Sequence, residues 1–203
     1  MKLYNELNPA PNPRRVRVFL AEKGISIPLE RVPMREGAHK SPEFMAKNSL
    51  GQVPLLELDD GSLLSESVSI YRYLEELHPT PCLFGRDTWE RARVDMWTRR
   101  IEFALMNPIT AVWANTHRFT ARLGTQYKDY GEAMRTRTLE RLRWLNRELS
   151  GREFIATDIY SMADIIALTT IDFAIWIGIE MPTELPHLKD WHTRMSARPS
   201  AAA

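Results

Sequence analysis

The first 80 residues alternate short apolar runs with segments of helical periodicity. Residues 2–4 and 25–32 predict two strands, and the segment between them repeats apolar residues at helical spacing. The prolines before residue 14 interrupt the first strand, and Gly24 is the kind of residue that ends a helix in the left-handed conformation. A strand, a helix and a second strand form a βαβ unit, whose crossover is expected to be right-handed.

An apolar strand, a turn and a helix are predicted in the next stretch. Residues 53–58 form the strand, and Asp59-Asp60-Gly61 is a hairpin sequence that returns the chain through residues 62–64. Glu66-Ser67 then begins a helical pattern that runs to His78, where the following prolines end it. This stretch therefore predicts the order ββα after the βαβ unit.

The second half of the chain is helical in pattern. Apolar residues advance by three or four over residues 94–113, and Pro108 is expected to kink this helix, or to end it and start another. Ser161-Met162-Ala163-Asp164 is a relative of the capping box, and residues 165–177 behind it carry one charge, which predicts a buried helix. Two further helices are predicted by the same spacing, over residues 129–149 and 185–198.

These elements predict two domains of different class. Residues 1–78 are expected to form an α/β domain, residues 79–87 a linker, and residues 88–203 an all-helical domain. Each part has an ordinary size for a domain.

Composition excludes several classes of protein. The 27 basic and 26 acidic residues give a net charge of +1, so no general basic surface for nucleic acid is expected. The single cysteine, Cys82, excludes a disulfide or a Cys-x-x-Cys site within the chain. The N-terminus is too polar for a signal peptide, and no apolar run is long enough to span a membrane. We expect a cytoplasmic protein with no nucleic-acid or membrane partner.

The segment around Val53-Pro54 has the character of a peptide-binding site. A proline at the start of a strand cannot donate to a β-ladder, so the backbone of Val53 can pair with a partner that is not another strand. Glu66 can hold an ammonium group, and Ser67 with the amides at a helix start can hold a carboxylate. A backbone-pairing position beside both fits a short zwitterionic peptide, of which glutathione is one.

The order Asn-x-x-Gly-x-Val-Pro, a hairpin, then Glu-Ser at a helix start resembles the thioredoxin-fold half of the cytosolic glutathione transferases. The resemblance implies an N-terminal thioredoxin-like domain (βαβ-ββα) followed by an all-α domain. It also implies that the Val53-Pro54 bond is cis, that Val53 pairs with the cysteinyl backbone of glutathione, and that Glu66 and Ser67 hold its γ-glutamyl end. By the same resemblance, three further residues are candidates for the glycyl end: His39, Lys40 and Gln52.

The position that stabilises the glutathione thiolate departs from the common types. Where many members carry Ser or Cys, this chain has Ala10. Tyr4 does not substitute for the missing side chain, because it lies in the first strand and is expected to pack in the interior. Asn12 is the candidate catalytic residue, because its amide can donate to a thiolate. Asn12 followed by Pro13 also fits a helix N-cap, and the two roles can coexist. A Pro-Asn pair here is similar to that of the Nu-like bacterial transferases.

The resemblance implies a homodimeric glutathione transferase that directs the ionised thiol at a hydrophobic electrophile. Glutathione would be a co-substrate, with no further cofactor and no metal. Two alternatives stay open: a glutathione-dependent peroxidase or disulfide reductase of Nu-like type, and a glutathione-binding module without turnover, which the loss of a hydroxyl at Ala10 would explain. The electrophile pocket is expected in the helical domain, at Phe103, Met106, Asn107 and Trp113.

Overall fold

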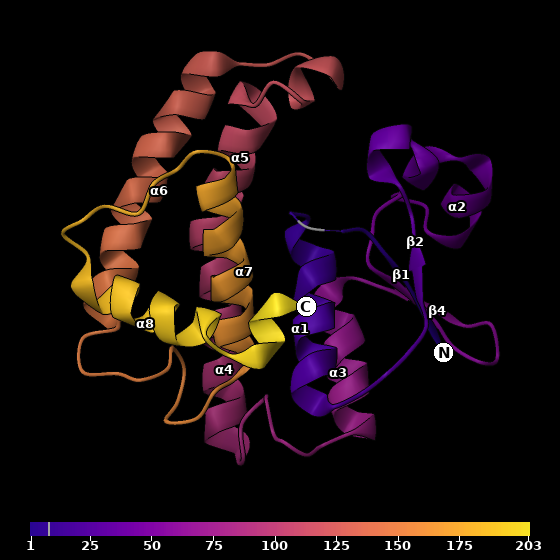
Figure 1. Ribbon diagram of the computed structural model, residues 1–203, viewed down its shortest axis with the longest axis horizontal. Helices are drawn as coiled ribbons and strands as arrows, with labels where there is room; N and C mark the ends of the chain where they lie inside the picture. Colours follow the sequence, from indigo (N-terminus) through magenta and orange to yellow (C-terminus); the bar gives the residue numbers. More distant parts are fainter. Residues whose placement is uncertain (8) are drawn as a thin grey trace. The chain divides into compact units, whose positions relative to one another are not determined.

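The structure of the chain is a computed structural model that describes residues 1–7 and 9–203 (Figure 1). The chain divides into two compact units, residues 1–83 with 199–203, and residues 84–198. The last five residues therefore group with the first unit, whereas the sequence analysis assigned them to the helical domain. They do so because the turn Pro199–Ala202 packs on the first helix, where Arg14 Nη2 donates to the carbonyl of Ala201 at 2.8 Å.

The first unit is a thioredoxin-like sheet with helices on its faces. Its sheet has the order β2-β1-β3-β4, in which β1 is parallel to β2 and antiparallel to β3, and β3 and β4 form a hairpin. The elements in chain order are β1 (Lys2–Asn5), α1 (Pro11–Lys23), β2 (Leu29–Arg31), two 3₁₀ turns (Met34–Glu36 and Ala38–Lys40), α2 (Pro42–Lys47), β3 (Leu55–Glu57), β4 (Leu63–Ser65) and α3 (Ser67–Leu77). The predicted order βαβ-ββα is confirmed.

Each face of the sheet buries alternate strand residues. Tyr4 and Leu55 are paired across β1 and β3 and pack with Phe44 of α2, whose ring lies 5.8 Å from that of Tyr4. Leu3 and Leu56 are the next pair, are fully buried, and point to the opposite face, which α1 and α3 cover (Figure 1). This alternation follows from the two-residue period of a strand.

One predicted boundary of this unit is confirmed and another differs. Gly24 adopts φ 64° and ends α1, as the sequence predicts. The second strand is shorter than expected, since only residues 29–31 of the predicted 25–32 pair with β1. The side chains of residues 29–31 are all exposed, and β2 is an edge strand of the sheet. The strand is therefore defined by backbone pairing and not by burial.

The second unit is all helical. Its elements are α4 (Thr88–Arg100), a π-helical segment (Ile101–Met106), α5 (Asn107–Thr116), a 3₁₀ turn (Thr120–Arg122), α6 (Lys128–Glu148), α7 (Met162–Trp176) and α8 (Pro186–Ser196). Among the described residues, no helix is long and apolar enough to cross a membrane.

Pro108 ends one helix and starts another, through a π-helical segment. Pro108 is the second residue of α5, and the N–H of Asn107 bonds to the carbonyl of Glu102, five residues back. A proline cannot donate to the preceding turn, and a wider turn before it accommodates the ring. The sequence prediction of one helix over residues 94–113 is thus resolved into three consecutive segments.

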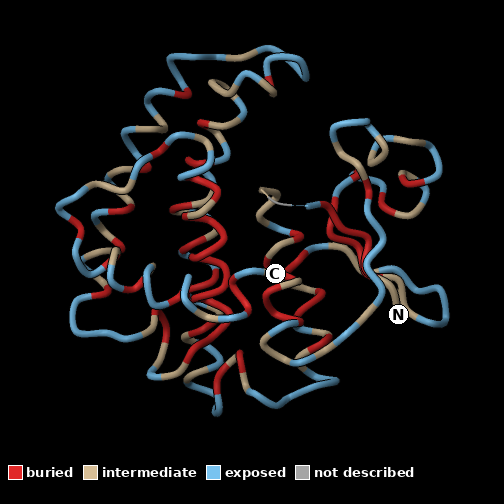
Figure 2. Tube along the Cα trace, viewed as in Figure 1, coloured by how far each residue is buried: buried red, intermediate tan, exposed pale blue. Residues whose placement is uncertain are grey.

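The buried helix α7 is confirmed, and most of its length is red in Figure 2. The predicted capping box is present, because Ser161 and Asp164 exchange side-chain and backbone hydrogen bonds at its N-terminus. Asp164 is fully buried and also accepts from the N–H of Ile155 at 2.9 Å and from Trp191 Nε1 at 3.0 Å. A single carboxylate therefore joins α7, the preceding loop and α8.

Candidate functional site

The strand register brings four chain segments to one end of the sheet. Leu55 pairs with Tyr4 of β1 and with Ser65 of β4, so the start of β3 lies beside the ends of both. β2 runs parallel to β1, so the two strands end at the same end of the sheet. The segments that leave β1, β2 and β4 therefore meet the segment that enters β3, and together they carry the site residues predicted in this unit: Ala10, Asn12, His39, Lys40, Gln52, Val53, Pro54, Glu66 and Ser67.

A buried asparagine shapes the loop before β3. Asn48 Nδ2 donates to the carbonyl of Gln52 at 2.8 Å, and Asn48 Oδ1 accepts from the N–H of Leu50 at 3.2 Å. The Val53-Pro54 bond that follows is cis, as the resemblance implies. Within residues 1–7 and 9–203, the backbone of Val53 makes no hydrogen bond, so its N–H and carbonyl are available to an extended ligand.

Gly51 holds this loop against the segment that leaves β2. Its φ is +56°, and a Cβ at this position would lie 2.5 Å from the carbonyl oxygen of His39 and 2.6 Å from Met45 Sδ. Lys40 Nζ donates to the carbonyl of Leu50 at 2.8 Å. Only glycine fits such a close approach with a left-handed backbone, and the approach brings His39 and Lys40 beside the loop that ends in Gln52.

His39 and Lys40 differ in charge. Burial, with the neighbouring positive charge of Lys40, lowers the pKa of His39 below its usual value, so His39 is neutral near pH 7. Its Nδ1 is buried and has no hydrogen-bond partner among the described residues. At this corner Lys40 thus supplies the positive charge and His39 an unpaired polar atom.

Glu66 and Ser67 form the N-terminus of α3. Glu66 is the N-cap residue and has φ 67° and ψ 118°, a left-handed φ that a non-glycine residue rarely adopts. Ser67 is the first helical residue and is 6% exposed. Ser67 therefore does not cap α3, because Glu66 occupies the N-cap position. A strained residue beside the open backbone of Val53 is a common feature of ligand sites.

The N-terminus of α1 is arranged differently from the expected Asn12 cap. The helix begins at Pro11, and the N-cap is Ala10, with no side-chain cap bond. Asn12 is the second helical residue and is exposed, so the predicted N-cap at Asn12 is wrong: Pro11, and not Pro13, takes the first position that suits proline. Both prolines lack an N–H, which leaves Asn12 as the backbone donor among the first three helical residues.

Tyr4 does not reach this helix start with its hydroxyl. It is 4% exposed, and its hydroxyl donates to Glu57 Oε2 at 2.7 Å within the sheet. The expectation that Tyr4 packs inside is confirmed. The candidates for the thiol position that remain are Asn12 and the start of α1.

Glu6 was not identified from the sequence. It directly follows β1, is buried, and accepts from the N–H groups of Leu7 and Met34 at 2.8 and 2.7 Å. A carboxylate directly after an apolar strand is the sequence feature that could have pointed to it, because such a group is seldom buried without a role.

The four residues predicted for the electrophile lie on the π-helical segment and α5. Phe103 is 63% exposed, Asn107 is exposed, and Met106 and Trp113 are partly buried. The Trp113 ring contacts that of Phe173 at 6.0 Å, which in turn stacks on Trp176 at 5.9 Å. Trp113 is thus held within an aromatic cluster, while Phe103 is presented to the surface.

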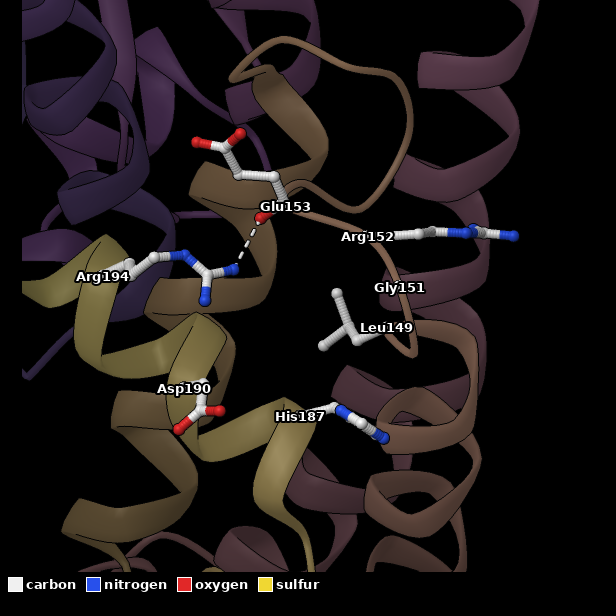
Figure 3. A pocket seen from close by; sticks show the side chains of 7 residues that line it. All are labelled: Leu149, Gly151, Arg152, Glu153, His187, Asp190 and Arg194. Carbon is white, nitrogen blue, oxygen red and sulfur yellow. Dashed lines mark hydrogen bonds between the residues drawn. The ribbon is translucent and has the colours of Figure 1, made fainter.

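A groove of 420 Å³ lies elsewhere in the helical unit, between α8 and the loop after α6 (Figure 3). Arg194 Nη2 points into the groove and donates to the carbonyl of Glu153 at 2.9 Å. His187 and Asp190 lie on the same helix, α8, and also line the groove. Charged and polar side chains dominate its walls, so it does not offer the apolar surface that a hydrophobic electrophile needs. The described residues contain no cluster of His, Cys, Asp and Glu that could hold a metal ion.

A thioredoxin-like unit with a cis-proline loop and a helix N-terminus at one end of its sheet, followed by an all-helical unit, is the arrangement that the resemblance to the cytosolic glutathione transferases implies. Comparison with known proteins gives the family. The glutathione S-transferase N-terminal domain matches residues 10–77, and the C-terminal domain matches residues 103–199. The chain belongs to the glutathione S-transferase family.

Relatives match over nearly the whole chain. Glutathione S-transferase 2 of Saccharomyces cerevisiae is 37% identical over 94% of this chain and 83% of its own length. Human glutathione S-transferase theta-2 is 30% identical over 97% and 81%. The crystal structure of Gtt2 from Saccharomyces cerevisiae superimposes with a TM-score of 0.93 at 35% identity, covering 100% of this chain and 99% of the other.

Proposed function

We propose that this protein is a glutathione transferase that ionises the glutathione thiol and directs it at a hydrophobic electrophile. The observation that carries the proposal is the strand register, which places the open backbone of Val53 beside Glu66 and Ser67 at one end of the sheet. Val53 would pair with the cysteinyl backbone, Glu66 would hold the γ-glutamyl ammonium, and Ser67 with the α3 amides its carboxylate.

The glycyl carboxylate would be bound at the other side of this loop. Lys40 supplies a positive charge, and His39 and Gln52 supply neutral polar groups close to it. The Gly51 contact fixes these residues against the Val53 loop before the ligand arrives. A site arranged in advance loses less entropy when it binds.

Asn12 would stabilise the thiolate from the start of α1. Ala10 offers no hydroxyl, so the donors there are the side-chain amide and the backbone N–H of Asn12, helped by the positive end of the helix dipole. A thiol has a pKa near ~8.5, and lowering it by about two units requires about 2.7 kcal/mol in favour of the thiolate. One or two charge-assisted hydrogen bonds with a helix N-terminus are of that size.

The helical domain would bind the electrophile around Phe103, Met106, Asn107 and Trp113. Support comes from the π-helical segment, since such segments are frequent at functional sites and this one presents an exposed aromatic side chain. We also propose a cytoplasmic homodimer that needs glutathione as co-substrate and no other cofactor, on the resemblance to the cytosolic transferases. Light scattering of the purified protein tests the dimer.

The test of function has a binding arm and a turnover arm. Retention on immobilised glutathione and heat in a calorimetric titration are expected, and absence of both would contradict the proposal. Turnover of a halogenated aromatic compound with glutathione is then measured beside that of a hydroperoxide and hydroxyethyl disulfide. Conjugation should dominate. The relatives do not favour the two alternatives. A reductase would turn over the hydroperoxide or the disulfide instead of the aromatic compound, and an inactive module would bind glutathione without turnover of any of the three.

A further inference from the structure

The carboxylate of Glu6 joins two connections of the first unit. Its Oε1 accepts from the N–H of Leu7 at 2.8 Å, and its Oε2 accepts from the N–H of Met34 at 2.7 Å. Glu6 and Leu7 begin the connection from β1 to α1, and Met34 begins the first 3₁₀ turn after β2. The two N–H groups belong to segments 27 residues apart and are held by the two oxygens of one side chain.

Both connections lead to the glutathione-binding residues. The carbonyl of Leu7 accepts from the N–H of Ala10 at 3.3 Å, directly before the helix start that carries Asn12. The turn that begins at Met34 is followed by the turn that contains His39 and Lys40. Glu6 therefore links the segment that leads to Asn12, on the thiol side of the glutathione site, to the segment that leads to His39 and Lys40, on the glycyl side.

Two arginines fix Glu6 itself. Arg17 Nη1 donates to the backbone carbonyl of Glu6 at 2.8 Å and to Asn5 Oδ1 at 2.7 Å, and Arg31 Nε donates to Glu6 Oε1 at 3.1 Å. Glu6 is 9% exposed, so its carboxylate is largely screened from water by these partners. A buried carboxylate with several donors and little exposure has a defined position.

The Glu6 carboxylate is ionised near neutral pH, and its negative charge also acts on His39 in the glutathione site. Burial acts to raise the pKa of Glu6, but the N–H groups of Leu7 and Met34 and the Arg31 guanidinium outweigh it and hold the pKa below its ordinary value. Glu6 also acts to raise the pKa of His39, against burial and Lys40. Its negative charge is thus close enough to influence a predicted ligand residue.

We propose that Glu6 is a positioning residue that sets the separation between the thiol side and the glycyl side of the glutathione site. This inference rests on the proposed function. Glutathione must reach both sides at once, and small displacements of binding groups can cost large factors in affinity and rate. No contact between Glu6 and glutathione is required, because the effect passes through Leu7 and Met34.

The decisive variant is Glu6→Gln, which keeps the shape but replaces one acceptor oxygen by an amide NH₂. Leu7 and Met34 can then no longer both keep an acceptor, and the link from Glu6 to Met34 that joins the two connections is weakened. We expect the dissociation constant for glutathione, measured by calorimetry, to rise at least tenfold, with a similar rise in the KM for glutathione. The KM for chlorodinitrobenzene should stay within about twofold, since this substrate does not span the two connections.

Glu36→Gln is the matched control. Glu36 lies on the 3₁₀ turn that begins at Met34 and is exposed, and its carboxylate makes no hydrogen bond or ion pair among the described residues. It should leave both KM values unchanged. A purely structural role for Glu6 would lower the melting temperature and the active fraction but leave the glutathione affinity of the folded fraction intact, and that result would overturn the proposal.

Glu6→Asp keeps the test valid if Glu6→Gln does not fold. It retains the charge but is shorter by one methylene, so it cannot reach both N–H groups at their present distances. A smaller loss of glutathione affinity with an unchanged electrophile KM is expected, and wild-type glutathione affinity in this variant would refute the role. Failure of the wild-type protein itself to bind glutathione would instead contradict the proposed function.

Discussion

At the scale of single residues, the site combines an unusual backbone with few special side chains. Glu66 has a left-handed φ without being glycine, and Ala10, the N-cap of α1, offers no hydroxyl. Neither feature helps the fold in an obvious way. Predictions at this scale therefore separate stability from ligand binding.

Glu66→Gly should separate the two most sharply. Glycine adopts φ 67° without steric cost, and a strained residue costs of order 1–3 kcal/mol, so the free energy of unfolding should stay level or rise by up to about 1 kcal/mol. Glutathione affinity should fall because the carboxylate is lost. Glu66→Gln is the control, since it removes the charge but keeps the strain; a rise in its stability equal to that of glycine would contradict the role of strain. Denaturant titration and calorimetry measure both quantities.

Ser67→Ala should weaken glutathione binding with little effect on the fold. Ser67 is not the N-cap, and its hydroxyl makes no hydrogen bond to the described part of the chain, so its removal leaves no partner unsatisfied. We expect a stability change below about 0.5 kcal/mol and at least a tenfold loss of affinity. Unchanged affinity with a lower melting temperature would assign Ser67 to the fold alone.

Asn12→Ala should raise the thiol pKa of bound glutathione. Asn12 is exposed and caps nothing, so the unfolding free energy should change by less than about 0.5 kcal/mol. The pKa is measured by thiolate absorbance at saturating glutathione. Ala10→Ser is the complementary variant: a hydroxyl at the N-cap should stabilise α1 by about 1 kcal/mol and lower the thiol pKa if it faces sulfur. If neither variant shifts the pKa of the bound glutathione thiol, the thiol does not lie at the start of α1.

At the scale of elements, the site depends on loops that are shaped by close backbone approach. The Asn48 hydrogen bonds and the Gly51 contact join the segment before β3 to the turn that contains His39 and Lys40. These contacts are local, but they place residues from two connections together. Elements that meet in this way should lose ligand binding when the approach is blocked.

Gly51→Ala tests this dependence. A Cβ would lie 2.5 Å from a backbone oxygen that cannot move alone, and alanine also disfavours φ +56°. We expect a loss of about 2 kcal/mol or more in unfolding free energy, together with weaker glutathione binding. Gly61→Ala is a control, since its φ is +83° but no atom lies within 4 Å of the added Cβ. Equal losses in both variants would show that φ, and not the close approach, decides the result.

At the scale of the whole molecule, one buried carboxylate should make stability depend on pH. Burial raises the pKa of Asp164 to about 6, although the N–H groups of Ile155 and Ser161, the Ser161 hydroxyl and Trp191 favour the ionised form. The folded state then holds a proton that the unfolded state releases above its ordinary pKa of 3.8. This contribution is complete below pH 3.8 and is lost as the pH rises through 6.

Asp164→Asn isolates this effect because asparagine does not titrate. The unfolding free energy of the wild type, minus that of the variant, should fall by about 2 kcal/mol between pH 4 and pH 7. Denaturant titrations across that range measure the difference, and Asp190→Asn on the exposed side of α8 serves as the control. A constant difference would mean that the hydrogen bonds keep Asp164 ionised in the folded state.

The sequence determined the elements, because they depend on local chemistry. Apolar spacing, Gly24, the Asp59-Asp60-Gly61 turn and the Ser161 capping box act within a few residues of themselves. The order of Val53-Pro54 and Glu66-Ser67 also follows from the strand and hairpin that separate them. Local patterns were sufficient for the elements, whereas the roles given to Val53, Glu66 and Ser67 come from the resemblance to the glutathione transferases.

Only the tertiary structure decided the details that depend on residues far apart in the chain. The edge strand β2 is defined by pairing with β1, the start of α1 by which of three prolines enters the helix first, and the position of residues 199–203 by packing on α1. Glu6 shows the same limit, since its partners Leu7 and Met34 are adjacent only after the parallel pairing of β1 and β2. Long-range pairing has no local pattern in the sequence, which is the physical reason why these features had to be observed.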